Sequence, residues 1–582
     1  MIRGDKRLET AILLGCLLAI LALRWHPIWA IGFYQDDAVS SSWLHEARAT
    51  NLTTFAYCWD SFQMLVTLHG RITPIYNFGI QPLIMAVEER LWLYRLLQAA
   101  FHIAALLAFA MWLKRAGANA VYLSLCVGTL ASIYEIRDYH DASFSQAVTL
   151  PVTALLGFLA LERAEALRNG DSSGWWRRIA ACSGLSLAAI STHEFGLGFS
   201  VAALCTVLLT PHKYRQRFTG AAVVFLPSLI LILAGLRLKV GSINSGTSFG
   251  SFSLPVIATT FLKQTLATLP FSYALARPDA LAVPAEGLYL PNLVLGALSA
   301  TFVVALCWYC TRSEIKPARG SALAASALLV VVSAGLTSIS SKYQQELRWG
   351  IGYTQTYIQY FGLSVLLVGG LTAMLRGVNR VPMFPMFRRI CRLVAAIGLG
   401  GTVFVSFSHS VAVAEHINRY WRYPREALAV ALADQARSRP VSQVELRVDR
   451  NYLQRWENFY FLFQHTGWRG RFLTATGTAG GGDPRVQSFG VKYPSVVDKS
   501  DVVLLVFSEL APGDGHVSNG KTTIYVLCID RHKLDRVVLS LAPKSGGVAL
   551  RDFPTNSAQG WTYKRIDISQ AGHAEHYGIS LL

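Results

Sequence analysis

The sequence predicts an α-helical polytopic membrane protein with about eleven transmembrane helices and a C-terminal extracytoplasmic domain of α/β or α+β class. Of the 582 residues, 52% are hydrophobic and only 15% are charged, whereas soluble globular chains carry about 25% charged residues. Long apolar stretches dominate residues 1–413, while residues 414–582 have the composition of an ordinary soluble domain. We therefore expect a multi-spanning domain over 1–413 and a water-facing domain over 414–582.

Apolar segments of about 20 residues, the length of helix that crosses a hydrocarbon layer of about 30 Å, recur along the first part of the chain. The predicted spans lie near 9–31, 93–113, 118–134, 146–162, 179–193, 195–210, 218–236, 289–310, 321–339, 356–375 and 393–413. No small-residue cleavage site follows the first apolar run, which favours a retained span over a signal peptide. We interpret the apolar segment 74–90, which contains Pro82, as a helix on the membrane surface.

The orientation follows from the distribution of Lys and Arg, because positive residues close to a span resist export. Every second predicted loop is basic, as in Lys114-Arg115 and Arg177-Arg178, and the loops between them are poorer in Lys and Arg. This alternation predicts a multi-pass protein of the cytoplasmic (inner) membrane with a cytoplasmic N-terminus. After eleven spans the C-terminal domain is periplasmic or extracellular.

The net charge of +18 does not indicate a partner nucleic acid, because most of the excess lies in short cytoplasmic loops. Seven of the nine cysteines fall within or beside predicted spans, including the pair Cys307 and Cys310, which has no second CxxC to make a metal site. Cys58 and Cys528 are predicted to lie outside, where an oxidising compartment permits a disulfide between them.

The C-terminal domain shows strand patterns after one helical pattern. Residues 424–437 have apolar positions at helical spacing, and four strand-like runs follow near 443–448, 502–507, 522–529 and 537–541. The Gly-rich stretch 477–482 is interpreted as a flexible loop, because the Lys-Ser/Thr of a phosphate-binding loop does not follow it.

Asp36 and Asp37 are two adjacent carboxylates just beyond the first predicted span. Charged groups close to hydrocarbon are costly unless they have partners or a role. In one interpretation they only end the first helix or cap a helix over 38–48. In the other, one of them is a general base, because a partly desolvated carboxylate can accept a proton from an acceptor hydroxyl.

A second acidic cluster, formed by Glu135, Asp138 and Asp141, lies in the next outer loop. A spacing of three residues places these side chains roughly on one face of a helix. Oxygen ligands of this kind can bind a divalent metal ion. Pairing with Arg137 and nearby lysines explains the same residues without a metal, so the cofactor stays open.

Several cations belong to the same predicted face: Arg71, His193, Lys342 and Arg348. The planar fork of an arginine suits phosphate oxygens. A phosphate leaving group gains negative charge in the transition state, and nearby cations stabilise it. Each cation alone is explained as well by a salt bridge or by a side chain that reaches the membrane surface.

The order of these features resembles the GT-C superfamily of membrane glycosyltransferases, including the protein O-mannosyltransferase-like enzymes. The matching features are the first span, Tyr34-Gln-Asp36-Asp37, a long outer loop, Gly70-Arg71-x-x-Pro74 with a surface helix, a span from Tyr94-Arg95 to Lys114-Arg115, and a second acidic outer loop. The resemblance covers roughly residues 1–210, and 211–413 only in general character. This chain has Asp-Asp where many members have Asp-Glu.

The resemblance implies a glycosyltransferase that takes a sugar from a polyprenyl-phosphate-linked donor, with Asp36 or Asp37 as the base. The outward-facing acids agree with such a donor, since nucleotide sugars are cytoplasmic. The expected partners are the donor, membrane lipid and an acceptor glycan, lipid or protein. A polysaccharide polymerase or ligase would share the topology, and a lipid or glycan transporter would place ionisable residues within its spans.

Overall fold

The computed structural model describes residues 6–34, 36–87, 90–136, 143, 146–168, 174–240, 252–275, 290–310, 315–380, 385–418 and 422, and ten strands between 444 and 581. Its contacts divide the chain into two units, one of residues 1–30 and 54–414 and one of residues 31–53 and 415–582. The division after Ala414 lies next to the expected boundary at 413. Residues 31–53, expected in the membrane domain, group with the second unit instead.

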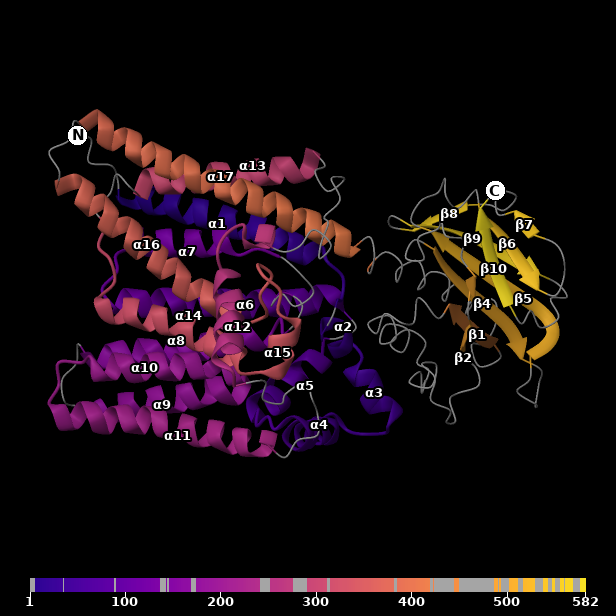
Figure 1. Ribbon diagram of the computed structural model, residues 1–582, viewed down its shortest axis with the longest axis horizontal. Helices are drawn as coiled ribbons and strands as arrows, with labels where there is room; N and C mark the ends of the chain where they lie inside the picture. The colour runs from indigo at the N-terminus through magenta and orange to yellow at the C-terminus, as the bar shows by residue number, and fades with distance from the viewer. Residues whose placement is uncertain are drawn as a thin grey trace. The chain divides into compact units, whose positions relative to one another are not determined.

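The first unit consists of long helices (Figure 1). They are α1 (Lys6–Ala30), α6 (Leu91–Arg115), α7 (Ala120–Ile133), α8 (Thr149–Arg168), α9 (Trp175–Thr192), α10 (Leu197–Leu208), α11 (Tyr214–Val240), α13 (Leu290–Cys310), α14 (Gly320–Ser338), α16 (Thr356–Arg380) and α17 (Pro385–Ile417). Shorter elements are α4 (Thr54–His69), η1 (Tyr76–Ile80), α5 (Gln81–Met85), η2 (Glu194–Gly196), α12 (Leu254–Leu266), η4 (Ser272–Leu275) and α15 (Ser341–Glu346). Each predicted span range falls on one of the long helices.

Among the described residues, six helices are long and apolar enough to cross a membrane: α6, α11, α13, α14, α16 and α17. The chain is therefore a helical membrane protein. The other five predicted spans fall on shorter or more polar helices. For example, α7 has 14 residues and a length of about 21 Å at 1.5 Å per residue. In the predicted surface segment 74–90, η1 and α5 follow one another without a break, and their 5 residues each make a helical stretch too short for a span.

The core of the helical unit is an aromatic cluster where α6, α8, α10 and α16 meet. Phe158 of α8 lies 5.1 Å from Phe109, 5.0 Å from Phe199 and 4.9 Å from Phe361, measured between ring centroids. Most of α8 is buried, so this helix contacts protein rather than lipid. A helix inside a bundle can keep charged residues at its end, which explains why α8 does not meet the criterion for an apolar span.

Gly157 permits the close approach of α8 and α10. A Cβ atom at this position would lie 2.2 Å from Cγ of Phe199, closer than any real carbon contact. Small residues at such positions let membrane helices approach closely and gain van der Waals contact.

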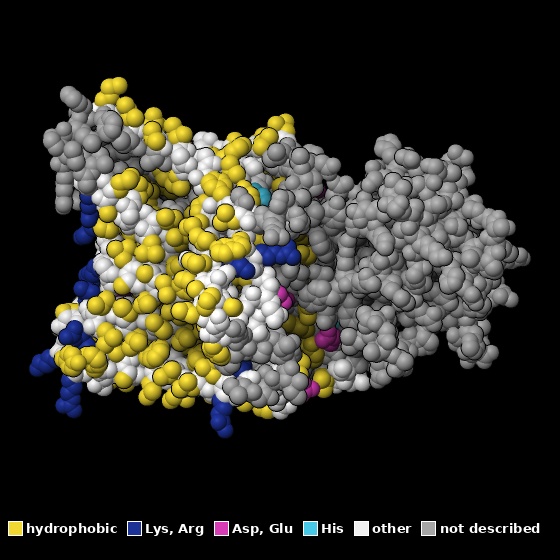
Figure 2. Space-filling model, viewed as in Figure 1, with side chains coloured by type: hydrophobic (Ala, Val, Ile, Leu, Met, Phe, Trp, Pro, Cys, Tyr) yellow, Lys and Arg dark blue, Asp and Glu magenta, His cyan; other side chains and the backbone are white. Residues whose placement is uncertain are grey.

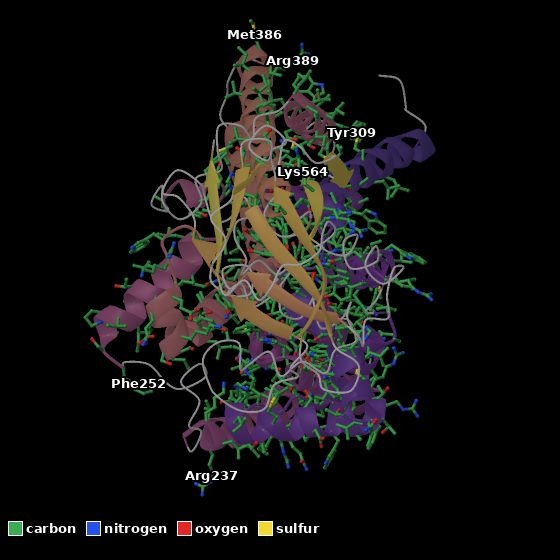
Figure 3. All side chains as sticks on the ribbon, turned by 90° about the vertical axis from the view of Figure 1, so that its right-hand side faces the viewer. Arg237, Phe252, Tyr309, Met386, Arg389 and Lys564 are labelled. Carbon is green, nitrogen blue, oxygen red and sulfur yellow. The ribbon has the colours of Figure 1, made fainter. Side chains whose placement is uncertain are left out.

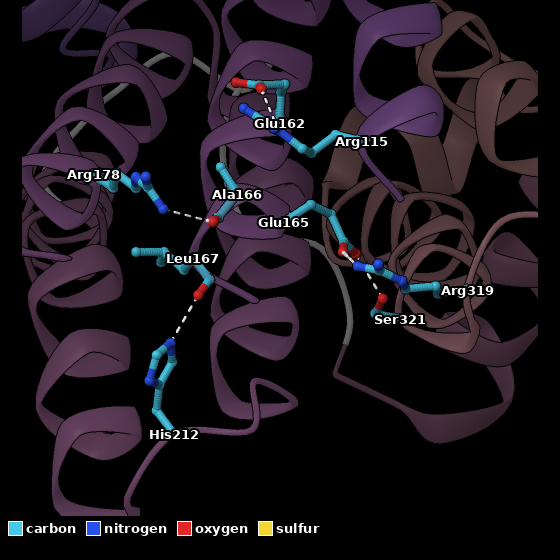
Figure 4. Close-up of polar contacts among 9 residues, drawn as sticks. All are labelled: Arg115, Glu162, Glu165, Ala166, Leu167, Arg178, His212, Arg319 and Ser321. Atoms are coloured by element: carbon cyan, nitrogen blue, oxygen red, sulfur yellow. Dashed lines mark hydrogen bonds and ion pairs between the residues drawn. The ribbon is translucent and has the colours of Figure 1, made fainter. Parts of the chain in front are cut away.

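Charged residues join several helices at one end of the bundle (Figure 4). Arg115 Nε at the end of α6 donates to Glu162 of α8 at 3.0 Å. The fully buried Glu165 accepts a 2.6 Å hydrogen bond from Ser321 Oγ and lies 3.9 Å from Arg319 Nη1, both at the start of α14. His212 contacts the carbonyl oxygen of Leu167 at 2.7 Å. We call this set the Glu165 end of the bundle.

The outer surface of the helices is apolar. Figure 2 shows hydrophobic side chains over the flank of the bundle, with Lys and Arg side chains gathered along its left edge. At the start of α17, where Figure 3 labels Met386 and Arg389, the side chain of Met386 is 73% exposed. Val394 and Ile397 of the same helix are 63% and 56% exposed. Such a surface is stable in contact with lipid tails.

The second unit contains the short helices α2 (Asp36–Ser40) and α3 (Trp43–Ala49) and two sheets. The strands are β1 (Val444–Asp449), β2 (Val486–Phe489), β3 (Val491–Lys492), β4 (Val502–Leu510), β5 (Val517–Cys528), β6 (Val537–Ala542), β7 (Gly547–Ala549), β8 (Thr555–Ala558), β9 (Trp561–Ile568) and β10 (His576–Leu581). One sheet has the order β2-β1-β4-β5-β9-β8 and the other β3-β10-β6-β7. Among the described strands, β1–β2 and β3–β10 pair in parallel and the other pairs are antiparallel.

All four strand-like runs fall on strands, namely β1, β4, β5 and β6. The mainly antiparallel pairing differs from the parallel pattern of an α/β domain. The predicted helix 424–437 and the Gly-rich stretch 477–482 lie outside the described residues. Cys58 is a buried thiol. The side chain of Cys528 lies outside the described part of the chain, so the disulfide stays a prediction.

Substitution of Gly157 by Ala is expected to lower the thermal stability of the purified protein. The added methyl group has no space beside Phe199, and overpacking of this kind costs about 1–3 kcal/mol. Gly184→Ala in α9 is the matched control, because nothing lies within 4 Å of its Cβ position. Thermal unfolding followed by tryptophan fluorescence in detergent measures both variants. Equal melting temperatures for the two variants would contradict the packing described here.

Candidate functional site

Two cations and one carboxylate meet at the end of the bundle opposite the Glu165 end. Glu194 follows the last residue of α9 by two positions, Arg71 follows α4, and Lys239 lies in the last turn of α11. Arg71 Nη2 lies 3.4 Å from Glu194 Oε1, and Lys239 Nζ lies 3.0 Å from Glu194 Oε2. Each carboxylate oxygen therefore has a different cation. We call these three residues the Glu194 triad.

Backbone geometry explains how Arg71 reaches this position. Gly70 has φ +59, in the left-handed region that favours glycine. A Cβ atom at Gly70 would lie 2.6 Å from the backbone nitrogen of Lys239. The absence of a side chain thus lets the loop turn back against the end of α11, which brings Arg71 and Lys239 to the same carboxylate.

The triad lines a cavity of about 100 Å³. Apolar side chains of two helices continue its wall: Leu231, Ile232 and Leu236 of α11, with Leu336 and Ile339 at the end of α14. Tyr343 of α15 also lines it. The cavity has a charged part at the end of the helices and an apolar part between them, which suits an amphiphile with an anionic group.

The triad carries one net positive charge. Burial opposes ionisation of Glu194, but the charges of Arg71 and Lys239 outweigh it and hold the pKa of this carboxyl well below its usual value of 4.5. Burial and the same two cations lower the pKa of His69, so this imidazole stays neutral at physiological pH. The two cations of the triad thus share one carboxylate.

The four predicted cations have different environments. Arg71 lines the cavity, whereas Lys342 and Arg348 do not. Lys342 Nζ lies 4.0 Å from Glu346 and 5.5 Å from the ring centroid of Tyr353, and Arg348 is exposed. His193 is buried beside the triad, where its Nδ1 accepts a hydrogen bond from the Phe195 backbone at 3.3 Å. His193 therefore caps η2 through an unprotonated nitrogen.

The acidic pair lies in the first turn of α2, in the second unit. Asp37 is only 1% exposed, and Asp36 is half-buried. The backbone oxygen of Asp36 accepts a 2.7 Å hydrogen bond from Ser40 Oγ. Acids in a first turn stabilise a helix N-terminus, which agrees with the interpretation that the pair only starts a helix. The burial of Asp37 agrees equally with the interpretation that one of the two is a desolvated general base.

Only Glu135 of the second acidic cluster is described, because Asp138 and Asp141 lie outside the described residues. Glu135 is fully buried and accepts hydrogen bonds from Ser406 Oγ and, at 3.2 Å, from the backbone of Phe271. In the described part of the chain, no group of three His, Cys, Asp or Glu side chains could hold a metal ion. These hydrogen bonds of Glu135 connect α17 and the Phe271 turn to the end of α7.

The sequence did not single out Lys239 or the role of Glu194. Lys239 follows a predicted span that ends at 236, at the start of a Gly/Ser-rich loop. Glu194 directly follows His193 in the sequence. One signal was present: a positive residue just past the outer end of a span departs from the basic-inside pattern.

In comparisons with known proteins, no family model, no curated protein and no solved structure matches the chain. The site is therefore interpreted from its own residues.

The stability that Glu194 contributes is expected to depend on pH. Because its folded-state pKa lies below 4.5, the contribution is complete above that value and is lost as pH falls through the lower folded pKa. The melting temperature of Glu194→Gln should lie below wild type at neutral pH, and the difference should shrink below pH 4.5. Thermal unfolding across the pH range measures this, with the exposed Arg237→Gln as control. A difference that stays constant through acid pH would count against the ion pairs.

Proposed function

We propose that the protein is a glycosyltransferase of the GT-C type. It transfers a sugar, with inversion, from a polyprenyl-phosphate-linked donor to an acceptor glycan, lipid or protein at the outer face of the cytoplasmic membrane. Arg71 and Lys239 hold the donor phosphate, and Asp36 or Asp37 deprotonates the acceptor hydroxyl. This proposal rests on the residue pattern and on the cavity at the Glu194 triad.

The observation that carries the proposal is the pairing of two cations with an apolar wall in one cavity. A polyprenyl phosphate has one anionic head and a long apolar tail. Arg71 and Lys239 match the head, since hydrogen bonds from charged donors to phosphate are about twice as strong as neutral ones. Ile232 and Leu336 match the tail. A soluble nucleotide sugar has no apolar chain to place there.

The packing of the helices supports lateral access for such a tail. α11 packs against α4, α9 and α10, while α14 packs against α10, α12, α15 and α16. The apolar cavity residues of α11 and α14 are half-exposed. A lipid tail can then stay between the two helices while its phosphate reaches the triad.

The proposed topology has eleven spans with a cytoplasmic N-terminus and residues 414–582 outside. The helix contacts support it, because segments predicted on the same side meet. The backbone of Asn119 donates to Lys316 at 3.1 Å, and that of Arg319 donates to Ala116 at 3.0 Å, joining two predicted cytoplasmic loops. Arg71, Glu194 and Lys239 join three predicted outer segments.

A metal ion is not required by this mechanism, since positive charge for the leaving phosphate comes from Arg71 and Lys239. The cluster Glu135, Asp138 and Asp141 remains the candidate for a divalent ion if one takes part.

The alternative functions are a polysaccharide polymerase or ligase and a lipid or glycan transporter. Buried His102 within α6, whose Nδ1 lies 3.1 Å from the hydroxyl of Tyr357, is the kind of residue that a transporter uses. The experiments below separate these functions from the proposed transfer.

Removal of either cation is expected to weaken binding of a short-chain polyprenyl phosphate to the purified protein. Arg71→Gln and Lys239→Gln each delete a hydrogen bond from a charged donor, so Kd should rise about 10- to 100-fold. The matched control is Arg237→Gln, since Arg237 lies in the same helix end but is exposed and points away from the bundle in Figure 3. If Arg71→Gln and Lys239→Gln both fold and bind the polyprenyl phosphate as tightly as wild type, these two residues do not bind the phosphate.

Loss of the base is expected to abolish transfer without loss of donor binding. In a strain with the gene deleted, glycan analysis should show a missing sugar that wild-type protein restores. Asp36→Asn or Asp37→Asn, whichever removes the base, should fail to restore it while inserting normally in the membrane. If both variants restore the full glycan, the acidic pair is only a helix start. The alternative functions, a polysaccharide polymerase or ligase and a lipid or glycan transporter, would then replace the proposed transfer.

A further inference from the structure

The carboxylate of Glu194 occupies the place where a bound phosphate would be held. Its two oxygens bridge Arg71 at 3.4 Å and Lys239 at 3.0 Å. Two oxygens of a phosphoryl group, which also diverge from a single central atom, would make the same two contacts. Glu194 and an incoming phosphate therefore compete for one pair of cations.

The contact with Arg71 is loose enough to exchange. Hydrogen bonds between a charged nitrogen and a carboxylate are usually about 2.7–2.9 Å, whereas the Arg71–Glu194 distance is 3.4 Å. The Glu194 side chain is 26% exposed, so its carboxylate can regain water when it leaves the cations. The Lys239 and Arg71 side chains keep 17% and 27% exposure and already face the cavity.

The local backbone also allows the movement. Glu194 begins η2, a three-residue turn of 3₁₀ helix between α9 and α10. Short 3₁₀ segments between helices are common connectors and hinges. A rotation about the Glu194 side-chain bonds changes the position of the carboxylate without moving either helix.

The charge balance favours exchange over simple addition. Two cations close to hydrocarbon are costly without an anion, and Glu194 supplies that anion when no phosphate is bound. A phosphate that enters replaces one negative charge by another, so the cations stay paired throughout. A phosphate without a glycosyl group carries more negative charge than the sugar-linked donor, and the return of Glu194 helps it to leave.

We propose that Glu194 is an internal competitor for the lipid phosphate, displaced from Arg71 and Lys239 when the phosphoryl group binds. This inference rests on the proposed function, because it assumes a phosphate at these cations. It makes Glu194 a positioning residue that limits donor affinity and promotes release of the phosphate product.

The test measures binding of a short-chain polyprenyl phosphate to purified Glu194→Gln, which keeps the shape of the side chain but removes its charge. Competition predicts tighter binding, with Kd lowered about tenfold, the equivalent of about 1.4 kcal/mol. The same substitution lowers thermal stability, since two cations lose their anion. Tighter binding together with lower stability separates competition from a structural role, for which affinity falls or does not change. Glu194→Asp retains the charge and should bind as wild type does.

The outcomes distinguish this inference from the phosphate site itself. If Arg71→Gln and Lys239→Gln weaken binding but Glu194→Gln does not tighten it, the site stands and the competition is overturned. If none of the three variants changes binding, the site and the inference both fail. A second arm uses inorganic phosphate, and tightening confined to that arm would overturn a lipid phosphate as the ligand.

Discussion

The constraint on which the structure depends is the cost of leaving a charge unpaired next to hydrocarbon. The chain meets it by collecting charged side chains at the two ends of the bundle and pairing them across helices. At one end, Glu162 and Glu165 of the buried helix α8 form ion pairs with Arg115 and Arg319, which lie at the ends of α6 and α14. At the other end, Glu194 forms ion pairs with Arg71 and Lys239. Each pair also fixes the relative position of segments that are far apart in sequence.

Close helix packing makes these pairs possible. Gly157 lets α8 approach α10, which keeps the acidic end of α8 inside the bundle. Gly70 has the same effect at the opposite end, where a side chain would separate the loop from α11. In both places a glycine lies a few residues before a charged residue that forms an ion pair: Gly157 before Glu162, and Gly70 before Arg71. Packing in the apolar part of the bundle thus determines which charges can meet at its ends.

The helices could be predicted because the information is local: an apolar run of sufficient length becomes a helix whatever surrounds it. The count of eleven spans stays a prediction, since α7 and α8 differ from α11 in length and burial rather than in periodicity. Arg71 was predicted as a phosphate ligand from its position near a span. Its partners were not, because Glu194 and Lys239 are 123 and 168 residues away in the chain. Lys342 was predicted by the same reasoning, but it pairs within its own helix.

The same electrostatic constraint links the fold to the proposed chemistry. A site that binds an anionic lipid head must contain cations, yet unpaired cations next to hydrocarbon are energetically costly. A carboxylate built into the site resolves this conflict, because the cations have a partner before the lipid arrives and after its product leaves. Its presence lowers the affinity for phosphate below what Arg71 and Lys239 alone would give. For an enzyme that must release a lipid phosphate in every cycle, weaker binding of that product favours turnover.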